Sequence, residues 1–528
     1  MKLLGVIPPQ LLLAANTKTF MTKSVIQKPS FARFSAILSS AILLLLAGCD
    51  ASTPSEQTSP YSSVNFPAYI AAENNPGGDT TVSIKPFASF ELPAANMNRK
   101  LRSDFHAGKA LANQPWVKAP TITTARDGLG PIYNARTCLM CHIKGGKGFI
   151  PADANTALMG TLVRLSKPGK VTDKNIKAGV NPHPVYGDQI QGQSISLAHQ
   201  LRHSQKPGTL KHDVAPEAYT YLNWVEHTFT YPDAHQVNLR KPELEFRNLG
   251  YGAIGENTLF SLRVAPAIAG MGLIELIDQS DINALSDEND VNQDGISGRV
   301  NWVWDNKLQT TAPGRFGLKS NKATLDMTVA GAFANDVGIT SALSPSQPCT
   351  KKQATCLSQP DGNDKNEVEL SDELLELVVN FNRNLAPVKR RKPNDDTVMQ
   401  GRKIFYQTGC QQCHNPQFKT LPSTLNPHLG EQIIWPYSDF LLHDLGPDLA
   451  DNRPDFQATG SEWRTAPLWG VGMLETVNGS GVLLHDGRAR TIEEAILWHG
   501  GEAMSVKDKF VNLPKPKRDA LVRFVNSL

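Results

Sequence analysis

The sequence lacks an excess of charge of either sign. Its 53 Lys and Arg residues nearly balance its 50 Asp and Glu residues, which leaves a formal net charge of +3 over 528 residues. A nucleic-acid partner or an anionic membrane surface favours a strongly basic chain, so we expect no nucleic-acid partner. The hydrophobic fraction of 40% is typical of folded globular proteins, and the length allows two or three domains.

The sequence also lacks an apolar run long enough to cross a bilayer. The run FSAILSSAILLLLAGC holds about 13 of the ~20 residues that a spanning helix needs, so a short transmembrane helix is the weaker interpretation. Lys23, Lys28 and Arg33 precede this run, which completes the layout of a secretory signal. The LAGC that ends at Cys49 resembles the lipobox of bacterial lipoproteins, whose acylated cysteine anchors the chain. We expect a lipid-anchored periplasmic protein, and Asp50 resembles an inner-membrane retention signal.

Cysteine is scarce, and four of the seven cysteines fall into two Cys-x-x-Cys-His motifs, CLMCH at 138–142 and CQQCH at 410–414. Two thiols one helical turn apart reach the two vinyl groups of one porphyrin, and the next residue brings an imidazole under the iron. A zinc site would need a second ligand pair at matching spacing, and a thioredoxin-like pair would not need the histidine. We expect two covalently bound haem c groups. Their predicted binding residues are Cys138, Cys141, His142, Cys410, Cys413 and His414.

Two further cysteines, Cys349 and Cys356, lie in a polar stretch with six residues between them. In an exported protein such a pair is expected to form a disulfide. The alternatives are two free thiols or a reactive dithiol. Only Lys351 and Lys352 lie close enough in sequence to lower a thiol pKa, which makes the reactive dithiol the weakest of the three.

Hydrophobic periodicity separates strand-rich from helix-rich parts of the chain. Alternation in YTYLNWVEHTFTYP and VNLRKPELEFRNL predicts antiparallel strands. Helical periods dominate from 321 to 381, and SDELLELVVNFN has Ser371 as its expected N-cap. The apolar face of that helix carries Leu374, Leu377, Val378 and Phe381. A closing helix is predicted from RDALVRFVNSL, with one face made of Leu521, Phe524, Val525 and Leu528.

An internal repeat indicates a duplicated haem domain. Residues 263–275, RVAPAIAGMGLIE, align with one gap to residues 464–475, RTAPLWGVGMLE, and each copy lies downstream of one Cys-x-x-Cys-His motif. We therefore expect a mainly α protein with two cytochrome c-like haem domains in tandem. The predicted parts are a signal peptide with lipobox (1–49), a flexible tether (50–80), an N-terminal haem domain (81–345) with a β-rich insertion (about 155–262), a linker (346–369) and a C-terminal cytochrome c domain (370–528).

Several longer motifs resemble one family. GLGPIYNARTCLMCH, RVAPAIAGMGLIE, DGISGRVNWV, GRFGLKS, EWRTAPLWGVG and LLHDGRARTIEEAILWHGGEA together resemble the di-haem oxidoreductases once called predicted thiol oxidoreductases. The resemblance runs from Pro76 to Leu528. More distantly, the chain is similar to the bacterial di-haem cytochrome c peroxidases and the MauG group. Leu318 departs from the pattern, because the family is expected to carry tryptophan in the GRFGxK stretch.

The stretch RTIEEAILWHGG predicts a helix whose inward face ends in a histidine. Thr491 and Glu494 form a capping box, and the residues on the inward face are Ile492, Ala495, Ile496 and His499. In the peroxidase group the matching segment supplies a methionine as the sixth iron ligand, twelve residues after the glycine of an HDG motif. Counting twelve residues from Gly487 reaches His499, so the resemblance implies a bis-histidine haem formed with His414.

Other interpretations of this site stay open. His499 could be a structural core histidine, and Met473 or His485 could supply the sixth ligand instead. A second imidazole lowers the reduction potential of a haem relative to methionine ligation, because imidazole stabilises ferric iron better. Three arginines could pair with haem propionates, namely Arg464, Arg488 and Arg490. The alternative is that they are ordinary surface arginines.

The first haem motif has no matching helix downstream. Residues 276–290, which follow its repeat, contain no histidine and no HDG motif, so its sixth iron position is expected to be open or weakly held. The candidate ligands for this position are His183, His199, His203, His212 and Met159, and spacing favours none of them over the others. In the peroxidase group a glutamine and a glutamate near the open iron transfer protons. The resemblance implies this catalytic role, by position, for Gln189, Gln191 and Glu275, each of which could equally be an ordinary polar residue.

The stretch DVNQDG at 290–295 copies the first half of an EF-hand loop. Asp290, Asn292 and Asp294 supply oxygen ligands at positions 1, 3 and 5, but position 12 is Asn301 instead of glutamate. A calcium site and a plain turn of Asp and Asn residues are equally consistent with this pattern.

The favoured function is a lipid-anchored di-haem oxidoreductase of the peroxidase type. A small donor protein or a quinone-linked donor would reduce the C-terminal haem, and the N-terminal haem would reduce peroxide or another small oxidant. The first alternative is a pure electron carrier, for example in periplasmic iron handling, with both irons six-coordinate. The second alternative is thiol oxidation, which the old family label implies.

Overall fold

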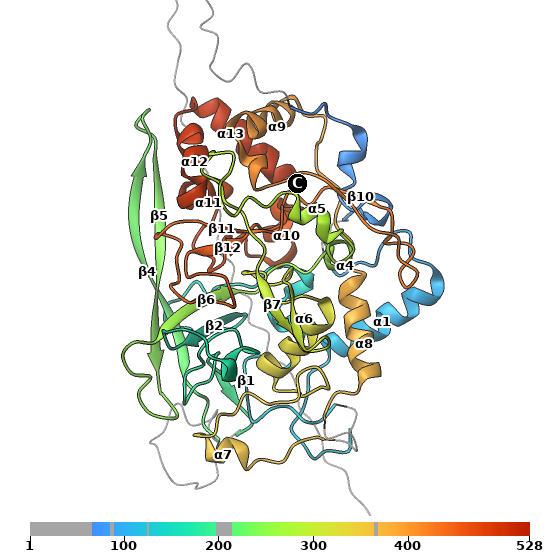
Figure 1. Cartoon of the computed structure of the whole chain (residues 1–528), viewed down its shortest axis with the longest axis vertical. Coiled ribbons are helices and arrows are strands. Elements are labelled where there is room, and N and C mark those ends of the chain that lie inside the picture. The colour runs from blue at the N-terminus through green and yellow to red at the C-terminus, as the bar shows by residue number, and fades with distance from the viewer. Residues whose placement is uncertain (1–65, 85–88, 124–125, 197–213, 364–367) are drawn as a thin grey trace, which may run out of the picture. The chain divides into compact units, whose positions relative to one another are not determined.

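The computed structural model describes residues 66–84, 89–123, 126–196, 214–363 and 368–528 (Figure 1). These residues all belong to one compact unit. The predicted signal peptide with Cys49, and the candidate ligands His199, His203 and His212, lie outside the described residues. Within the described ranges, none of the helices combines the length and the apolar character that crossing a membrane requires.

Helices carry most of the regular structure. The α-helices are α1 (Arg99–Asn113), α2 (Cys138–Cys141), α4 (Met271–Glu275), α5 (Gln279–Asn283), α6 (Leu325–Ala332), α7 (Ala354–Leu357), α8 (Asp372–Arg383), α9 (Asp396–Thr408), α10 (Leu474–Asn478), α11 (Ile492–Trp498), α12 (Met504–Val511) and α13 (Lys515–Ser527). Short helical turns are η1 (Ala71–Asn74), η2 (Gly78–Thr80), η3 (Ile143–Gly145), η4 (Asp173–Asn175), η6 (Phe333–Val337, a π-helical turn), η7 (Cys410–Gln412), η8 (Val471–Met473) and η9 (Gly501–Ala503).

Strands form separate two-stranded antiparallel sheets. The strands are β1 (Ile132–Tyr133), β2 (Thr161–Ser166), β3 (Gln193–Ser194), β4 (Tyr219–Thr230), β5 (Gln236–Arg247), β6 (Leu259–Val264), β7 (Trp302–Asp305), β8 (Thr310–Pro313), β9 (Phe418–Lys419), β10 (Ile433–Ile434), β11 (Leu442–Asp444) and β12 (Glu462–Arg464). The two alternating stretches form the long hairpin β4–β5, paired from Tyr219 with Arg247 to Thr230 with Gln236. The predicted antiparallel strands between about 155 and 262 are therefore confirmed.

Two helix pairs repeat the same close crossing. Helix α1 precedes the first Cys-x-x-Cys-His motif and packs on α8, and α9 precedes the second motif and packs on α13 (Figure 1). A Cβ added to Gly108 would lie 1.9 Å from the carbonyl oxygen of Leu377, and one added to Gly401 would lie 1.9 Å from that of Ala520. Glycine at each crossing therefore allows backbone contact between the helices. The predicted domain boundary at residue 370 separates α8 from the helix that it packs against.

The caps and apolar faces largely follow the sequence predictions. Ser371 caps α8, where its side chain accepts a hydrogen bond from the backbone N–H of Leu374. The face of α8 is rotated from the predicted one, because Leu375 and Val379 are buried where Leu374 and Leu377 were expected. All four predicted residues of the closing helix are buried.

Two segments, one predicted as a flexible tether and one as a linker, contain ordered and buried structure. Of the predicted tether, residues 66–80 are described, and they contain η1, η2 and a fully buried Glu73. The predicted linker 346–369 contains α7, and its Gln353 is 0% exposed. Flexibility was therefore the wrong prediction over 66–80, because polar composition does not reveal a side chain whose partners lie far away in sequence, and the linker stays a prediction.

The β4–β5 hairpin reaches the C-terminal helices. Tyr231 and Leu239, from its two sides, belong to a buried cluster with residues of α9, α11 and α13. The Tyr231 hydroxyl donates to Glu493 at 2.9 Å, and Arg518 of α13 pairs with Asp233 in the hairpin turn at 2.7 Å. A segment near the first motif in sequence thus packs against helices that follow the second motif (Figure 1).

Candidate functional site

The first motif begins a short helix. The Thr137 side chain caps α2 by accepting a hydrogen bond from the Met140 N–H, and the α2 turn brings Cys138 and Cys141 to its two ends. His142 follows directly, and its Nδ1 lies 2.8 Å from the carbonyl oxygen of Pro266, which belongs to the first repeat segment. A bond from Nδ1–H to a carbonyl leaves Nε2 as the nitrogen that can bind iron, a common arrangement in metal-binding histidines.

The second motif repeats this arrangement. His414 places its Nδ1 2.9 Å from the carbonyl oxygen of Tyr437, and His499 places its Nδ1 2.7 Å from that of Ala495. Both histidines line one cavity of ≈ 320 Å³, together with Cys410 and Cys413. The donor set fits a covalently attached haem with two axial imidazoles, because each ring has one nitrogen fixed by the backbone and the other left for iron.

Helix α11 presents His499 as the sequence predicts. The Thr491 side chain accepts from the Glu494 N–H at 3.1 Å, and the Glu494 carboxylate accepts from the Arg490 N–H at 2.9 Å. The cavity is lined by the whole predicted face, namely Ile492, Ala495, Ile496 and His499. Of the two alternative ligands, His485 also lines the cavity, stacked on Trp463 with ring centroids 3.6 Å apart, whereas Met473 does not line it.

Burial sets the protonation of these groups. It lowers the pKa of all three imidazoles, that of His414 to about 4, so the rings are neutral, the form in which histidine binds a metal. Burial also raises the pKa of the Cys138 and Cys141 thiols to about 12 and that of Cys410 to about 11. A reactive redox thiol needs a lowered pKa. The motif cysteines therefore do not suit the thioredoxin-like alternative.

The structure separates the three candidate arginines. Arg464 lines the cavity, and burial lowers its pKa to about 10. Within the described ranges its side chain donates hydrogen bonds to the carbonyls of Gly317 and Thr465 and forms no ion pair. Arg488 already pairs with Asp486 at 2.7 Å, and Arg490 pairs with Glu494 at 2.9 Å. Neither of the latter two lines the cavity. Among the three, Arg464 has the position and the unpaired charge that a haem propionate would need.

Several polar residues of the cavity were not predicted. Lys147, five residues after His142, lines the cavity and donates to the carbonyl of Leu484 at 2.5 Å. His443 also lines it and lies between two carboxylates, with Asp439 at 2.8 Å and Glu502 at 2.6 Å. Although burial opposes the charge, these carboxylates raise the pKa of His443 well above its ordinary value. Neither residue belongs to a recognisable spacing, so only the fold could identify them.

The predicted proton-transfer residues fall into two places. Gln189 Nε2 donates to Asp336 Oδ1 at 2.7 Å, and Gln191 Nε2 donates to the Asn335 carbonyl at 2.8 Å. Asn335 and Asp336 belong to the π-helical turn η6, and the Asp336 carbonyl accepts from the N–H of Asn134, just before the first motif. The two glutamines therefore lie beside the first motif.

Glu275 lies elsewhere and is occupied by structural contacts. Its carboxylate accepts from the Leu325 N–H at 3.2 Å, at the start of α6, and pairs with Arg383 at 2.7 Å. Among the described residues, no hydrogen bond or ion pair joins it to Gln189 or Gln191. Its predicted catalytic role has no support from these contacts.

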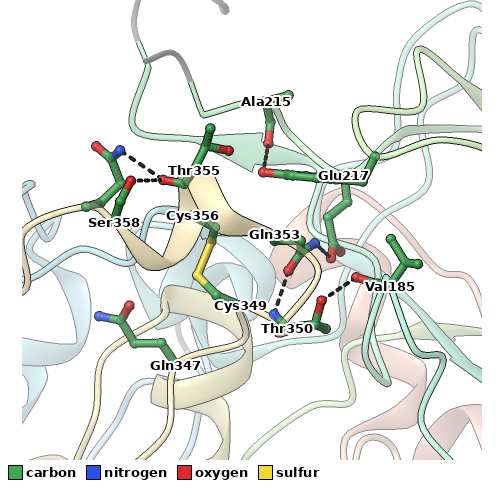
Figure 2. The surroundings of a disulfide bond; sticks show 12 residues. Val185, Ala215, Glu217, Gln347, Cys349, Thr350, Gln353, Thr355, Cys356 and Ser358 are labelled. Atoms are coloured by element: carbon green, nitrogen blue, oxygen red, sulfur yellow. Dashed lines mark hydrogen bonds between the residues drawn. A yellow bond between two sulfur atoms is a disulfide. The ribbon is translucent and has the colours of Figure 1, made fainter. Parts of the chain in front are cut away.

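A disulfide loop lies beside the buried Glu217 (Figure 2). Cys349 and Cys356 form a disulfide with an S–S distance of 1.99 Å. Inside this loop Gln353 donates to the buried Glu217 at 2.6 Å (Figure 2). The other Glu217 oxygen accepts from the Gln191 N–H at 2.7 Å. The loop thus fixes the backbone at Gln191 through one buried carboxylate.

Two candidate sixth ligands of the first haem are described, and the histidine among them is not free to bind iron. His183 uses both ring nitrogens, with Nε2 2.8 Å from the Ile254 carbonyl oxygen and Nδ1 accepting from the Tyr186 N–H at 3.1 Å. The Met159 side chain is 49% exposed. Among the candidates that lie in the described ranges, the structure therefore offers no strong ligand for this position.

The Asp-rich stretch forms hydrogen-bonded turns. Asp290 accepts from the Gly295 N–H at 3.2 Å, Asn292 from the Asp294 N–H at 2.9 Å, and Asp294 from the Ile296 N–H at 2.9 Å. These bonds account for the pattern as a plain turn. Calcium binding by these side chains stays a prediction.

The repeated helix crossings, the two Cys-x-x-Cys-His motifs and the neutral buried imidazoles define a protein of the di-haem class. Residues 69–528 match the family described as "Di-haem oxidoreductase, putative peroxidase", and the chain belongs to this family. A solved structure of Kuenenia stuttgartiensis hydrazine synthase, pressurized with xenon, is 18% identical with a TM-score of 0.21, and the match covers 30% of this chain and 56% of that chain. The chain thus spans about half of that protein, and comparison with curated proteins gave no match.

Proposed function

We propose that this member of the di-haem oxidoreductase family is a peroxidase-like enzyme with two covalently bound haem c groups. Cys410, Cys413 and His414 hold one haem, and His499 supplies its second axial imidazole. Cys138, Cys141 and His142 hold the other haem, whose far side is open or weakly held. Electrons enter at the bis-histidine haem and pass to the haem at His142. When bound, haem supplies the one-electron chemistry that peroxide reduction requires.

The observation that carries this proposal is the asymmetry between the two motifs. Both have a proximal histidine whose Nδ1 is fixed by a backbone carbonyl. In the described part of the chain, the second motif shares a cavity with another histidine held in the same way, whereas His183, the described histidine considered for the first haem, has both ring nitrogens engaged. The chain therefore suits one electron-transfer site with a filled coordination sphere and one site where a small oxidant can bind.

The polar residues beside the first motif support a proton-handling role. Gln189 is buried, and its Oε1 has no hydrogen-bond partner, so it can accept a bond from the O–H of a bound peroxide. Asp336 lies 2.7 Å from Gln189 Nε2, and burial raises its pKa. A protonated Asp336 holds its proton on the carboxyl oxygen that does not accept from Gln189, which makes Asp336 the candidate proton donor beside this motif. Gln191 holds the neighbouring carbonyl of Asn335.

The surroundings of the enzyme follow from the N-terminal sequence. We propose export to a bacterial periplasm, with anchoring through acylated Cys49 and retention at the inner membrane through Asp50. A small donor protein or a quinone-linked donor then supplies electrons. Thiol oxidation is a weaker candidate for two reasons. Cys349 and Cys356 form a disulfide, and burial raises the pKa of the motif thiols of Cys138 and Cys410.

The test is haem counting followed by peroxide turnover. The chain is matured in a host that attaches c-type haem, and a pyridine haemochrome assay should give two haems per chain. Stopped-flow mixing of the reduced protein with hydrogen peroxide should then show fast reoxidation. His142→Ala should abolish it, and the exposed control Met140→Leu should not. Two low-spin haems indifferent to peroxide and cyanide would instead identify an electron carrier.

A further inference from the structure

Tyr437 holds the proximal histidine of the second motif with a strained backbone. Its carbonyl oxygen lies 2.9 Å from His414 Nδ1, and the residue is 0% exposed. Its φ is +53°, in the left-handed region that side chains other than glycine rarely adopt. Such a conformation persists only when surrounding contacts impose it, and it is concentrated at functional sites.

The contact that fixes Tyr437 comes from the N-terminal segment. Its hydroxyl donates to the Glu73 carboxylate. Two buried arginines hold the same carboxylate, Arg390 at 2.9 Å and Arg402 at 3.0 Å. Glu73 is itself 1% exposed, so this is a closed network of one carboxylate, two guanidinium groups and a phenol. Removal of one partner from such a network leaves buried charge without compensation.

Backbone contacts place this segment against the second motif's half of the molecule. The Trp435 N–H donates to the Pro76 carbonyl at 2.8 Å, and the Arg390 N–H donates to that of Asn74 at 3.0 Å. Arg402 Nη1 donates to the Pro67 carbonyl at 2.9 Å. The Glu73 carboxylate is therefore held in place by its own backbone as well as by the arginines.

We infer that Glu73 is a positioning residue for the proximal imidazole of the second haem and acts through Tyr437. The carboxylate holds the phenol, the phenol holds the left-handed turn, and the turn aims its carbonyl at His414 Nδ1. A bond from Nδ1–H to a carbonyl makes the imidazole a stronger donor, which favours ferric iron and lowers the reduction potential. This inference rests on the proposed function, because it requires His414 to bind haem iron.

The test uses the full chain with both haems attached. Glu73→Gln removes the charge, and Tyr437→Phe removes only the phenol oxygen. Spectroelectrochemical titration measures both midpoint potentials in each variant, and the potential that changes in His499→Ala identifies the second haem. We expect the potential of the second haem to rise in both variants, while that of the first haem stays unchanged and serves as an internal reference.

A matched control distinguishes positioning from general destabilisation. Asp233→Asn breaks another carboxylate–arginine contact in the same half, the pair with Arg518 at 2.7 Å, which has no link to Tyr437. This control should lower the melting temperature without moving either potential. Unchanged potentials in Tyr437→Phe, at a haem count of two, would overturn the inference and leave the proposed function intact. A wild-type haem count below two would overturn the proposed function itself.

Discussion

The two Cys-x-x-Cys-His segments are alike on one side of the expected iron and different on the other. Each follows a helix that crosses a second helix at a glycine, and each ends in a histidine fixed through Nδ1 by a distant carbonyl. In the described part of the chain, helix α11 brings another histidine into the cavity of the second segment, whereas His183, the described histidine considered for the first, has both ring nitrogens engaged. The two segments therefore share the way in which the proximal histidine is held, and they differ in the helix that follows the second one.

The supports of the two segments differ as well. Near the first, a disulfide loop and the buried Glu217 fix the backbone at Gln191. Near the second, Glu73 from the N-terminal segment fixes the turn at Tyr437. Each segment is thus positioned by residues outside its repeat, which allows one to be perturbed without the other.

The largest expected effect comes from removing the ligand that distinguishes the two segments. His499→Ala should convert the second haem from low-spin to partly high-spin, because the sixth position loses its strong-field imidazole. The ferric absorption spectrum and electron paramagnetic resonance measure the change, and added imidazole should reverse it. The matched control is His485→Gln, since His485 lines the same cavity but stacks on Trp463. If the control gained the high-spin signal and His499→Ala did not, the assigned ligand would be wrong.

The features that sequence predicts here are local ones. The Cys-x-x-Cys-His spacing, the Thr491 cap of α11 and the position of His499 on its inward face depend on residues within a few turns of one another. The carbonyl partner of His142 lies 124 residues away, and Glu73 meets Arg390 across 317 residues. No periodicity encodes such pairings. The stretch around Glu73 was predicted as a tether because its composition is polar, although its carboxylate is buried.

The same limit explains why the packing of α8 and the pairing of the arginines could not be predicted. Helix α8 is recognisable from its own sequence, but its packing against α1 depends on Gly108, which no local pattern marks. Arg464 and Arg488 are indistinguishable in sequence, and only the fold shows that Arg488 already pairs with Asp486. Local chemistry was therefore predictable, and long-range pairing was not.

The next largest expected effect is a loss of stability when the glycines at the two helix crossings are replaced. These variants test whether the two crossings are equivalent. Gly108→Ala and Gly401→Ala each place a Cβ 1.9 Å from a backbone carbonyl, so the helices must separate. We expect each variant to lose about 3 kcal/mol of stability, more than the ~1 kcal/mol that alanine gains in helix propensity. Chemical denaturation measures the loss. The exposed controls Ser103→Ala and Gln400→Ala should change the stability little. A loss of stability in only one of the two glycine variants would show that the two helix crossings are not equivalent.

Removing the disulfide should affect the first segment only. Cys349→Ser together with Cys356→Ser opens a short loop, which costs about 2 kcal/mol on the chain-entropy model. Because Gln353 in this loop holds Glu217, we expect slower peroxide-driven reoxidation and an unchanged potential of the second haem. Lys351→Ala, an exposed change in the same loop, is the control. Equal changes at both haems would show that the loop supports the whole chain and not one site.

The smallest expected effect is a pH dependence confined to the same region. Burial raises the pKa of Glu217 well above 4.5, although the hydrogen bonds from Gln353 and Gln191 oppose the shift. A carboxyl group with a raised folded pKa holds its proton more tightly in the folded chain. Its contribution to stability is therefore lost as the pH rises from about 4.5 through the folded pKa, by at most ~1.4 kcal/mol per pH unit. Glu217→Gln cannot titrate, so its free energy of unfolding, measured from pH 4 to pH 8, should fall less steeply than that of the wild type. Parallel curves for the two proteins would show that Glu217 stays ionised and that its two amide donors outweigh burial.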